Sequence, residues 1–161
     1  MLEAISKDEF LEFQNVWGNN VVKVGKLYLE KRDHKQAAVD LVENLYGYNE
    51  GTVLFKPTRA QHNEFRLTAK SAVSYFIGDD PEFAEDTGFA LQPWTKVRFA
   101  NSGFIFHEDY AISMGNYFFT DLQNKEKKVE FTFGVFRADN GKLKINLHHS
   151  SIPYLHPKHN S

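Results

Sequence analysis

The stretch KKVEFTFGVFRADNGKLKINLHHSSIP, residues 127–153, decides the fold. It holds two strand-length runs rich in Phe, Val and Ile, and the Asp-Asn-Gly between them is typical of a hairpin turn. Two runs of the same kind precede it, at residues 95–109 and 110–121, and His-Glu-Asp between them is a further turn signal. The second half of the chain therefore predicts an antiparallel meander of four strands.

The first half of the chain has the three- and four-residue spacing of helices instead. A long helix is predicted from Ser6 to about Lys31, and Ser6 followed by Glu9 resembles a capping box at its start. Gly18 and Gly25 interrupt this helix, which indicates close packing against another element. The apolar face consists of Phe10, Phe13, Val16, Trp17, Val21, Val24, Leu27 and Tyr28.

Shorter elements are expected between this helix and the meander. A second helix is predicted at residues 34–48, with Gly47 as its end, and a third at residues 63–78, with its apolar side at Phe65, Leu67, Ala69, Ala72, Val73 and Phe76. Residues 51–58 form a short strand ended by Pro57, and residues 79–94 form a long loop of the kind used as a lid or binding segment. Helices first and antiparallel strands last indicate an α+β domain with its helices on one face of the sheet.

Composition narrows the class of protein. A chain of 161 residues with 15 Phe, 7 Tyr and 2 Trp fits one domain, residues 1–161, built as a curved sheet around a filled interior. A net charge of −2 without a basic stripe argues against nucleic-acid binding. The absence of cysteine excludes disulfides, thiolate zinc ligands and a thiol nucleophile. No signal peptide or membrane span is expected, so we predict a soluble cytoplasmic protein.

Four of the seven histidines lie near the end of the chain, two of them adjacent. On a strand, His148 and His149 point to opposite faces, so they cannot hold one metal ion together. Strict alternation puts Leu143, Ile145, Leu147 and His149 on one face and Lys144, Asn146, His148 and Ser150 on the other. His156 and His159 follow Pro153 in a segment, residues 152–161, that we expect to be mobile. We expect no metal site.

The same alternation gives matching sets on the other strands. Ser113, Gly115, Tyr117 and Phe119 share one face, and Thr132, Gly134 and Phe136 share another. In each strand one set is smaller and more polar than its opposite. Such a face is either solvated, as in many antiparallel sheets, or lines a cavity in which polar groups converge among aromatic rings.

Two motifs carry a family resemblance. FRADNGKLKINLHHSSIP, residues 136–153, resembles the closing hairpin of the association (hub) domain of calcium/calmodulin-dependent protein kinase II, where an aromatic-basic turn leads into a strand ending in histidine and serine. TVLFKPT, residues 52–58, resembles the short first strand of that family. The order of the elements is similar to the nuclear transport factor 2-like, or SnoaL-like, superfamily with its cystatin-like fold.

This resemblance implies a cone-shaped curved antiparallel sheet wrapped around the long N-terminal helix, a deep pocket, and dimers formed through the sheet. The hub domain carries arginines at three pocket positions that hold Tyr117, Gly134 and Ser150 here, so its anion pocket and its ring assembly are not implied. The alignment makes one set of residues face the cavity: Ser113, Tyr117, Thr132, Asn146, His148 and Ser150. It places His149 on the opposite side, toward a subunit interface.

Three functions remain open on these grounds. The first is a domain that binds an unknown small molecule in a polar-lined pocket. The second is a cofactor-independent enzyme of the isomerase, cyclase or dehydratase type, with Tyr117 and His148 moving a proton. In such an enzyme Asp86 or Glu85 would act as a base if their loop covers the mouth of the pocket. The third is an association or scaffold domain. No cofactor is expected in any of them.

Three further residues are candidates for ligand contact. Trp94 and Arg98, at the start of the meander, are placed to grip an anionic or planar ligand, although Arg98 also fits a surface arginine stacked on its neighbours. Trp17 belongs either to the core or to the ligand pocket. The many phenylalanines of the meander leave apolar area on its outer face, which predicts a homodimer or a higher oligomer.

Overall fold

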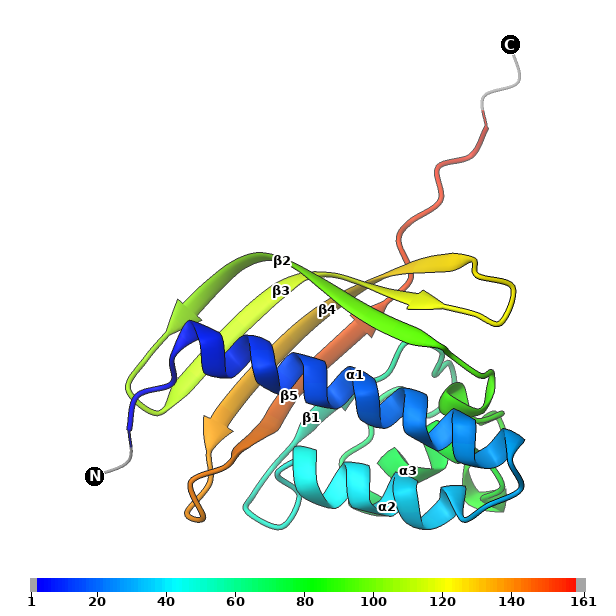
Figure 1. Cartoon of the computed structure of the whole chain (residues 1–161), viewed down its shortest axis with the longest axis horizontal. Coiled ribbons are helices and arrows are strands. Elements are labelled where there is room, and N and C mark those ends of the chain that lie inside the picture. Colours follow the sequence, from blue (N-terminus) through cyan, green and yellow to red (C-terminus); the bar gives the residue numbers. More distant parts are fainter. Residues whose placement is uncertain (1–2, 159–161) are drawn as a thin grey trace.

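The computed structural model describes residues 3–158 (Figure 1). Three helices and five strands form an α+β domain, and two short 3₁₀ helices lie in the loop before the meander. In chain order the elements are α1 (Lys7–Leu29), α2 (His34–Leu45), β1 (Leu54–Lys56), α3 (Ala69–Ile77), η1 (Pro81–Phe83), η2 (Phe89–Leu91), β2 (Lys96–Phe106), β3 (Tyr110–Thr120), β4 (Glu126–Arg137) and β5 (Leu143–Ser151).

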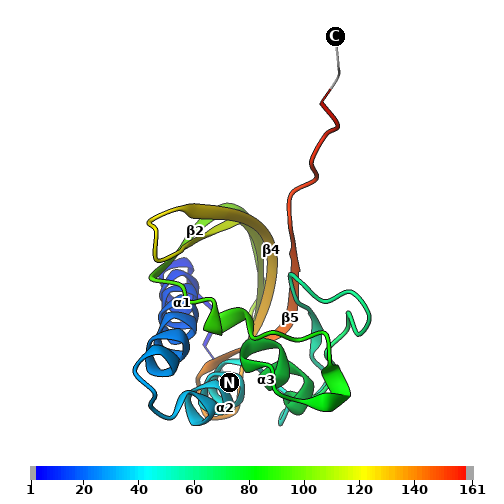
Figure 2. The ribbon, with the colours of Figure 1, turned by 90° about the vertical axis from the view of Figure 1, so that its right-hand side faces the viewer.

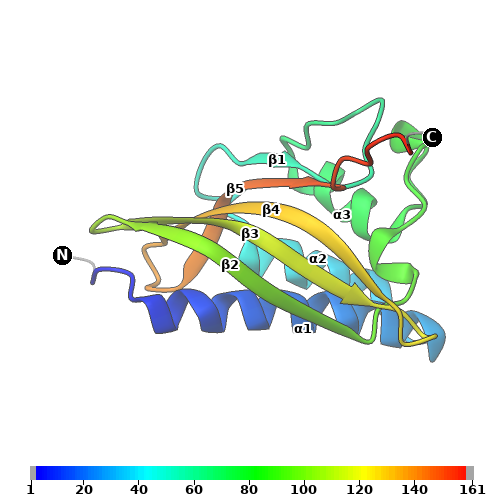
Figure 3. The same cartoon turned by 90° about the horizontal axis from the view of Figure 1, so that it is seen from above.

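The predicted meander is confirmed. The sheet has the order β1-β5-β4-β3-β2, and β2 to β5 pair antiparallel with their neighbours along the chain. The sheet curls so that its concave face receives the helices (Figure 2), and α1 lies along β2 (Figure 3). Among the strands of the described residues, β1 alone breaks the pattern, because it pairs parallel with β5 and brings residues near position 55 beside residues near position 148.

Close packing explains the glycines of α1. A side-chain carbon at Gly25 would lie 2.5 Å from the carbonyl oxygen of Ala90, and one at Gly18 would lie 3.0 Å from Val97. The helix begins as predicted, since the Ser6 hydroxyl accepts a hydrogen bond from the Glu9 backbone N–H. The Glu9 carboxylate does not complete the capping box. It binds the Arg137 guanidinium at 2.7 Å and ties α1 to the end of β4.

The third helix is shorter than predicted. It begins at Ala69, where Thr68 and Ser71 form a reciprocal capping box, and Gly78 closes it as expected. Residues 63–68 form neither helix nor strand, and Phe65 and Leu67 are exposed rather than part of the core. The capping box at Thr68, and not the spacing of the apolar residues, therefore determines where α3 begins.

The second helix also ends earlier than predicted, at Leu45. Tyr46 therefore has extended backbone and forms an isolated bridge with Ile145.

A bulge in β5 changes which side chains face inward. Gly134 of β4 pairs with Leu147 whereas Val135 pairs with Ile145, so Asn146 is an extra residue in β5. Ile145 is therefore buried on the same side as His148 and Ser150, and strict alternation was wrong across this point. The Asn146 side-chain oxygen is buried without a hydrogen-bond partner in the described part of the chain.

The outer face of the sheet carries exposed apolar side chains, among them Met114 and Ile105. The predicted dimer stays a prediction, as does the expected mobility of the tail. Residues 152–158 carry no secondary structure beyond β5 and lead away from the body (Figures 1 and 2), while His159 lies outside the described residues. Among the described helices, none combines the length and the apolar character needed to cross a bilayer.

A buried ion pair fastens the loop before the meander. The Arg66 guanidinium holds the Asp86 carboxylate through two hydrogen bonds of 2.7 Å, and the Ser74 hydroxyl donates to the same carboxylate at 2.6 Å. Both charged side chains are at most 2% exposed. Arg66 also donates to the carbonyl oxygens of Asn63 and Ser71, so the irregular segment before α3, α3 itself and the loop after it are linked at one point.

We predict that Asp86→Asn lowers the free energy of unfolding by about 3–5 kcal/mol, because it leaves the Arg66 charge buried and uncompensated. Urea unfolding measures the change. Arg98→Met is the control, since it removes an exposed ion pair with Glu126 and is expected to change stability little. Equal losses in the two variants would contradict the structural role given to Asp86.

Candidate active site

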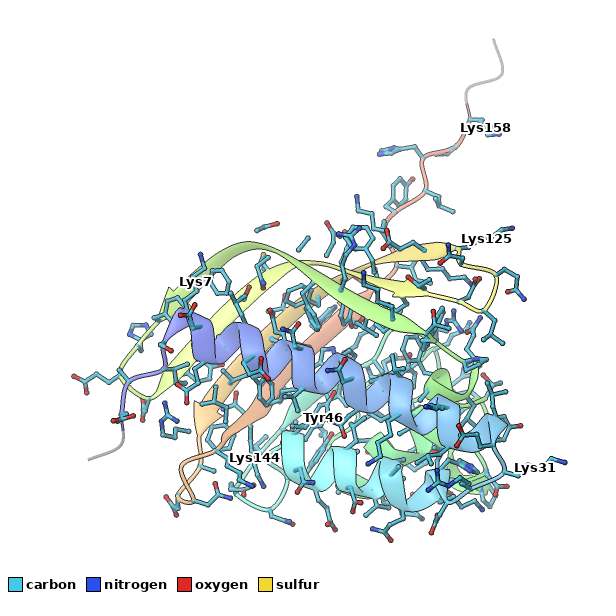
Figure 4. All side chains as sticks on the ribbon, in the orientation of Figure 1. Lys7, Lys31, Tyr46, Lys125, Lys144 and Lys158 are labelled. Carbon is cyan, nitrogen blue, oxygen red and sulfur yellow. The ribbon has the colours of Figure 1, made fainter. Side chains whose placement is uncertain are left out.

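A line of hydrogen bonds begins in α1 and crosses the core. The Trp17 indole Nε1–H donates to the Tyr46 hydroxyl at 3.1 Å, and the Tyr46 hydroxyl lies 2.8 Å from Nδ1 of His148. Figure 4 shows Tyr46 between the helices and the sheet. All three side chains are at most 2% exposed. Polar groups this deep must be paired, and each of these is.

The line continues on the other side of the imidazole. His148 Nε2 lies 3.1 Å from the Tyr117 hydroxyl, which donates in turn to the Ser150 hydroxyl through a short hydrogen bond. Ser150 Oγ lies 2.6 Å from Thr58 Oγ1, just beyond the end of β1. The parallel pairing of β1 with β5 accounts for this last contact, because it places Lys56 beside His149 and so brings Thr58, two residues after β1, near Ser150 of β5. Tyr117, His148 and Ser150 therefore converge, as the resemblance implied.

The donors along this line fix its direction. Tyr46 accepts from Trp17, so its own hydroxyl hydrogen is free to donate to Nδ1 of His148. A neutral imidazole with Nδ1 as acceptor carries its proton on Nε2 and donates to Tyr117. Tyr117 donates to Ser150. Either hydroxyl of the Ser150–Thr58 pair can donate, and we assign Ser150 as the donor because its oxygen already accepts from Tyr117. Thr58 Oγ1 is hydrogen-bonded to Ser150 and also interacts with the hydroxyls of Tyr75 and Tyr117. Thr58 forms part of the pocket wall, where rotation of its hydroxyl can direct the hydrogen to a ligand.

The surroundings keep the line uncharged. The imidazole of His148 is stacked on Phe55, with ring centroids 4.8 Å apart, and meets the edges of Phe133 and Trp17. Burial, and secondarily the neighbouring His149, hold the pKa of His148 well below its usual value. Burial raises the pKa of Tyr117 and of Tyr46 above the ordinary range of a phenol. At neutral pH the site therefore acts through hydrogen bonds between neutral groups.

A pocket of about 320 Å³ opens at this end of the cone, and Thr58 forms part of its wall. Aromatic rings of Phe89, Trp94 and Phe119 line it together with aliphatic side chains. Ser150 and Tyr117 lie directly behind Thr58. The pocket is thus apolar except for one inner hydroxyl and the basic side chains at its rim, a composition typical of small-molecule sites.

The other predicted ligand contacts lie at different distances from the pocket. Trp94 lines the pocket as expected, with its indole N–H bonded to the carbonyl of Phe89. Trp17 lies in the core beneath the site and is stacked on Tyr117 at 5.7 Å. Ser113 faces inward but farther along β3, where its hydroxyl donates to the side chain of Asn101 and the carbonyl of Gly103.

Four expectations are corrected. Thr132 faces the outer side of the sheet, where it is paired with His149, because the inward set on β4 is Phe131 and Phe133. Asn146 is displaced from the inward set by the bulge that it forms. Arg98 lies outside the cone, where it pairs with Glu126 and covers the ring of Phe118. Asp86 does not line the pocket, because Arg66 and Ser74 hold its carboxylate.

Two residues of the line were not predicted. Tyr46 was assigned to the second helix, and Thr58 to the end of a strand whose partner was unknown. The one usable signal was the Pro57-Thr58 ending of the short strand. Its role depends on the parallel pairing with β5, a contact between residues 92 positions apart in the sequence. Across residues 3–158, no group of three or more His, Cys, Asp or Glu side chains is arranged to hold a metal ion.

Comparison with known proteins identifies the family. A family model described as metal-independent carbonic anhydrase matches residues 8–152. The chain belongs to this family. A metal-independent carbonic anhydrase of Nostoc sp. strain PCC 7120 is 42% identical over 154 residues, which cover 94% of this chain and 75% of that protein.

Solved structures agree with the assignment to the metal-independent carbonic anhydrases. The crystal structure of an iota-carbonic anhydrase from a cyanobacterium, complexed with bicarbonate, is 40% identical, covers 97% of both chains and superposes with a TM-score of 0.93. A calcium/calmodulin-dependent protein kinase II association domain from Xanthomonas campestris superposes with a TM-score of 0.59 at 19% identity, covering 95% of both chains. A nuclear transport factor 2-like protein from Salmonella enterica gives 0.53 at 12% identity, covering 96% of both.

These comparisons refine the sequence analysis. The nuclear transport factor 2-like fold is confirmed, and the association-domain likeness is one of fold alone. The more specific relationship is to the metal-independent carbonic anhydrases, an assignment that the sequence analysis did not reach. The general expectation of a protein that takes a small molecule agrees with relatives of this kind.

We predict that protonation of His148 limits stability in acid. Its pKa in the folded protein lies below the unfolded value of about 6.5, so its contribution is complete above that pH and is lost as the pH falls. The contribution decreases by about 1.4 kcal/mol per pH unit below pH 6.5 until the folded pKa is reached. Urea unfolding of the wild type and His148→Gln between pH 4.5 and 7.5 measures the difference, with His149→Gln as the exposed control. A His148→Gln profile parallel to the wild type would contradict the prediction.

Proposed function

We propose that this protein catalyses the hydration of carbon dioxide to bicarbonate, using neutral hydroxyl groups rather than a metal-bound hydroxide. The observation that carries the proposal is the hydroxyl of Thr58, which faces the pocket at the end of the hydrogen-bonded line through Ser150, Tyr117 and His148. Membership of the metal-independent carbonic anhydrase family and the likeness to a bicarbonate-complexed relative support it.

The chemistry needs a group that moves a proton while water attacks the carbon. The oxygen of Thr58 accepts from Ser150 and has a second lone pair available to a water molecule in the pocket. Its own hydrogen is directed to an oxygen of carbon dioxide. As the water oxygen bonds to carbon, one water proton passes to Thr58 Oγ1 and the Thr58 proton passes to the substrate oxygen. The product is carbonic acid, which ionises to bicarbonate and a proton, and the enzyme is unchanged.

The groups behind Thr58 support this exchange without being consumed. Partial negative charge develops on Thr58 Oγ1 when its proton leaves before the water proton arrives, and the Ser150 hydroxyl stabilises that charge by donating to it. Tyr117 and His148 hold Ser150 in the donating orientation. Because these donors are fixed in a water-poor core, little reorganisation is needed during the reaction. The apolar walls of the pocket suit carbon dioxide, which is apolar.

We predict that Thr58→Val lowers kcat for carbon dioxide hydration by about 10²–10³, the usual effect of removing one fixed donor. Thr58→Ser keeps the hydroxyl and is expected to retain most of the activity. Stopped-flow measurement with a pH indicator, on protein treated with a metal chelator, provides the rates.

Thr132→Val is the matched control, because it makes the same chemical change on the outer face of β4 and is expected to leave kcat unaltered. Thermal unfolding of each variant separates loss of chemistry from loss of fold. A chelated wild type that hydrates carbon dioxide no faster than buffer would rule out the proposed function. Full activity in Thr58→Val would rule out the hydroxyl mechanism.

A further inference from the structure

The rim of the pocket carries charge of one sign only. Arg59 follows Thr58 directly, and Lys127 and Lys128 come from the start of β4. No carboxylate is among the lining residues, which are Thr58, Arg59, Phe89, Trp94, Phe119, Lys127, Lys128, Val129 and Ile152. The protein as a whole has a net charge of −2, so the positive charge at the opening is opposite in sign to the net charge of the protein.

Two of these cations are held in place by the aromatic wall. The Arg59 guanidinium lies 5.4 Å from the ring centre of Phe89 and 5.9 Å from that of Trp94. The Lys127 ammonium lies 5.8 Å from the same Trp94 ring. Contacts of this kind position a cation without neutralising it, because an aromatic ring carries no net charge. Trp94 therefore joins Arg59 and Lys127 across the opening.

The acidic residues of this region are engaged elsewhere. The carboxylate of Glu126, next to Lys127 in sequence, binds Arg98 on the outer face at 2.8 Å. The carboxylate of Glu85 accepts hydrogen bonds from the backbone N–H groups of residues 61–63. In the described part of the chain, neither Arg59 nor Lys127 forms an ion pair with a carboxylate within 4.0 Å.

The residues behind the rim carry no negative charge that would repel an anion. Tyr117, Ser150 and Thr58 are neutral hydroxyl groups, and buried His148 stays uncharged at neutral pH. A small anion at the opening thus meets two unneutralised cations and no nearby negative side chain among the lining residues. Apolar walls raise the strength of that attraction above its value in open water.

We propose that Arg59 and Lys127 form an anion-binding mouth that takes small monovalent oxyanions, bicarbonate among them, at the opening of the pocket. That bicarbonate is the physiological anion rests on the proposed function, whereas anion binding as such does not. Because the cations are at the solvent-facing rim and not in the core, the hold is weak enough for the anion to leave.

This mouth has a defined kinetic consequence. It raises the rate at which bicarbonate arrives but has no such effect on uncharged carbon dioxide. The equilibrium between the two is independent of the enzyme, so kcat/KM for hydration and dehydration must change by the same factor in any variant. Salt screens charges at a rim over about 10 Å at 0.1 M ionic strength, so the advantage should fade as salt is added.

The test uses Arg59→Gln/Lys127→Gln and the matched control Lys7→Gln/Lys142→Gln. The control removes the same charge at the opposite end of the molecule, from the start of α1 and the turn between β4 and β5 (Figure 1). None of these four residues belongs to the line of hydrogen bonds that runs from Trp17 to Thr58. Broadening of the chloride magnetic resonance signal, reversed by sodium nitrate or sodium bicarbonate, measures anion binding at low ionic strength.

We expect the Arg59/Lys127 variant to bind both oxyanions at least about fivefold more weakly than the wild type and the control. Its kcat/KM at low salt should fall about three- to tenfold, with values converging above 0.5 M salt. Equal affinities for both anions in the two double variants would overturn the proposal. A wild type that binds nitrate through these residues but does not hydrate carbon dioxide would uphold the mouth and reject the proposed function.

Discussion

The structure depends on keeping a row of polar groups satisfied inside an aromatic core. Trp17, Tyr46, His148 and Tyr117 lie in the centre of the cone, where water is excluded and an unpaired donor or acceptor costs about 1–3 kcal/mol. Each group has a partner only if α1, the end of α2 and the inner face of the sheet meet in one arrangement. The arrangement that satisfies these polar groups also produces the line of hydrogen bonds that ends at the pocket.

Much of this architecture follows from local sequence patterns. The helical spacing of Phe10 to Val24, the glycines that let α1 approach its neighbours, and the hairpin signal at residues 138–141 all describe contacts close in sequence. The meeting of Tyr117, His148 and Ser150 was predictable as well, because it needs only alternation on β3 and on the part of β5 after the bulge.

The parts that were not predicted have different physical causes. The bulge at Asn146 shifts the inward set by one residue, and no residue type at that position signals it. Thr58 acquires its role through a parallel pairing, and Tyr46 acquires its role because its helix ends at Leu45, two residues before the predicted end at Gly47. Asp86 has the features of a base on a loop, but Arg66, which lay in a segment predicted to be helical, neutralises it. Apart from the bulge, each of these features depends on a contact between segments that are far apart in the sequence, and local sequence patterns do not reveal such contacts.

The parallel contact between β1 and β5 also governs when the reactive centre can exist. Thr58 and Ser150 are 92 positions apart in the sequence, so the two hydroxyls cannot meet until β5 has been synthesised and has paired with β1. Deletion of β5 would remove His148 and Ser150 together but would leave the sequences of α1, α2 and α3 unchanged. The contact between Thr58 and Ser150 therefore depends on the pairing of β1 with β5, and not on the helices alone.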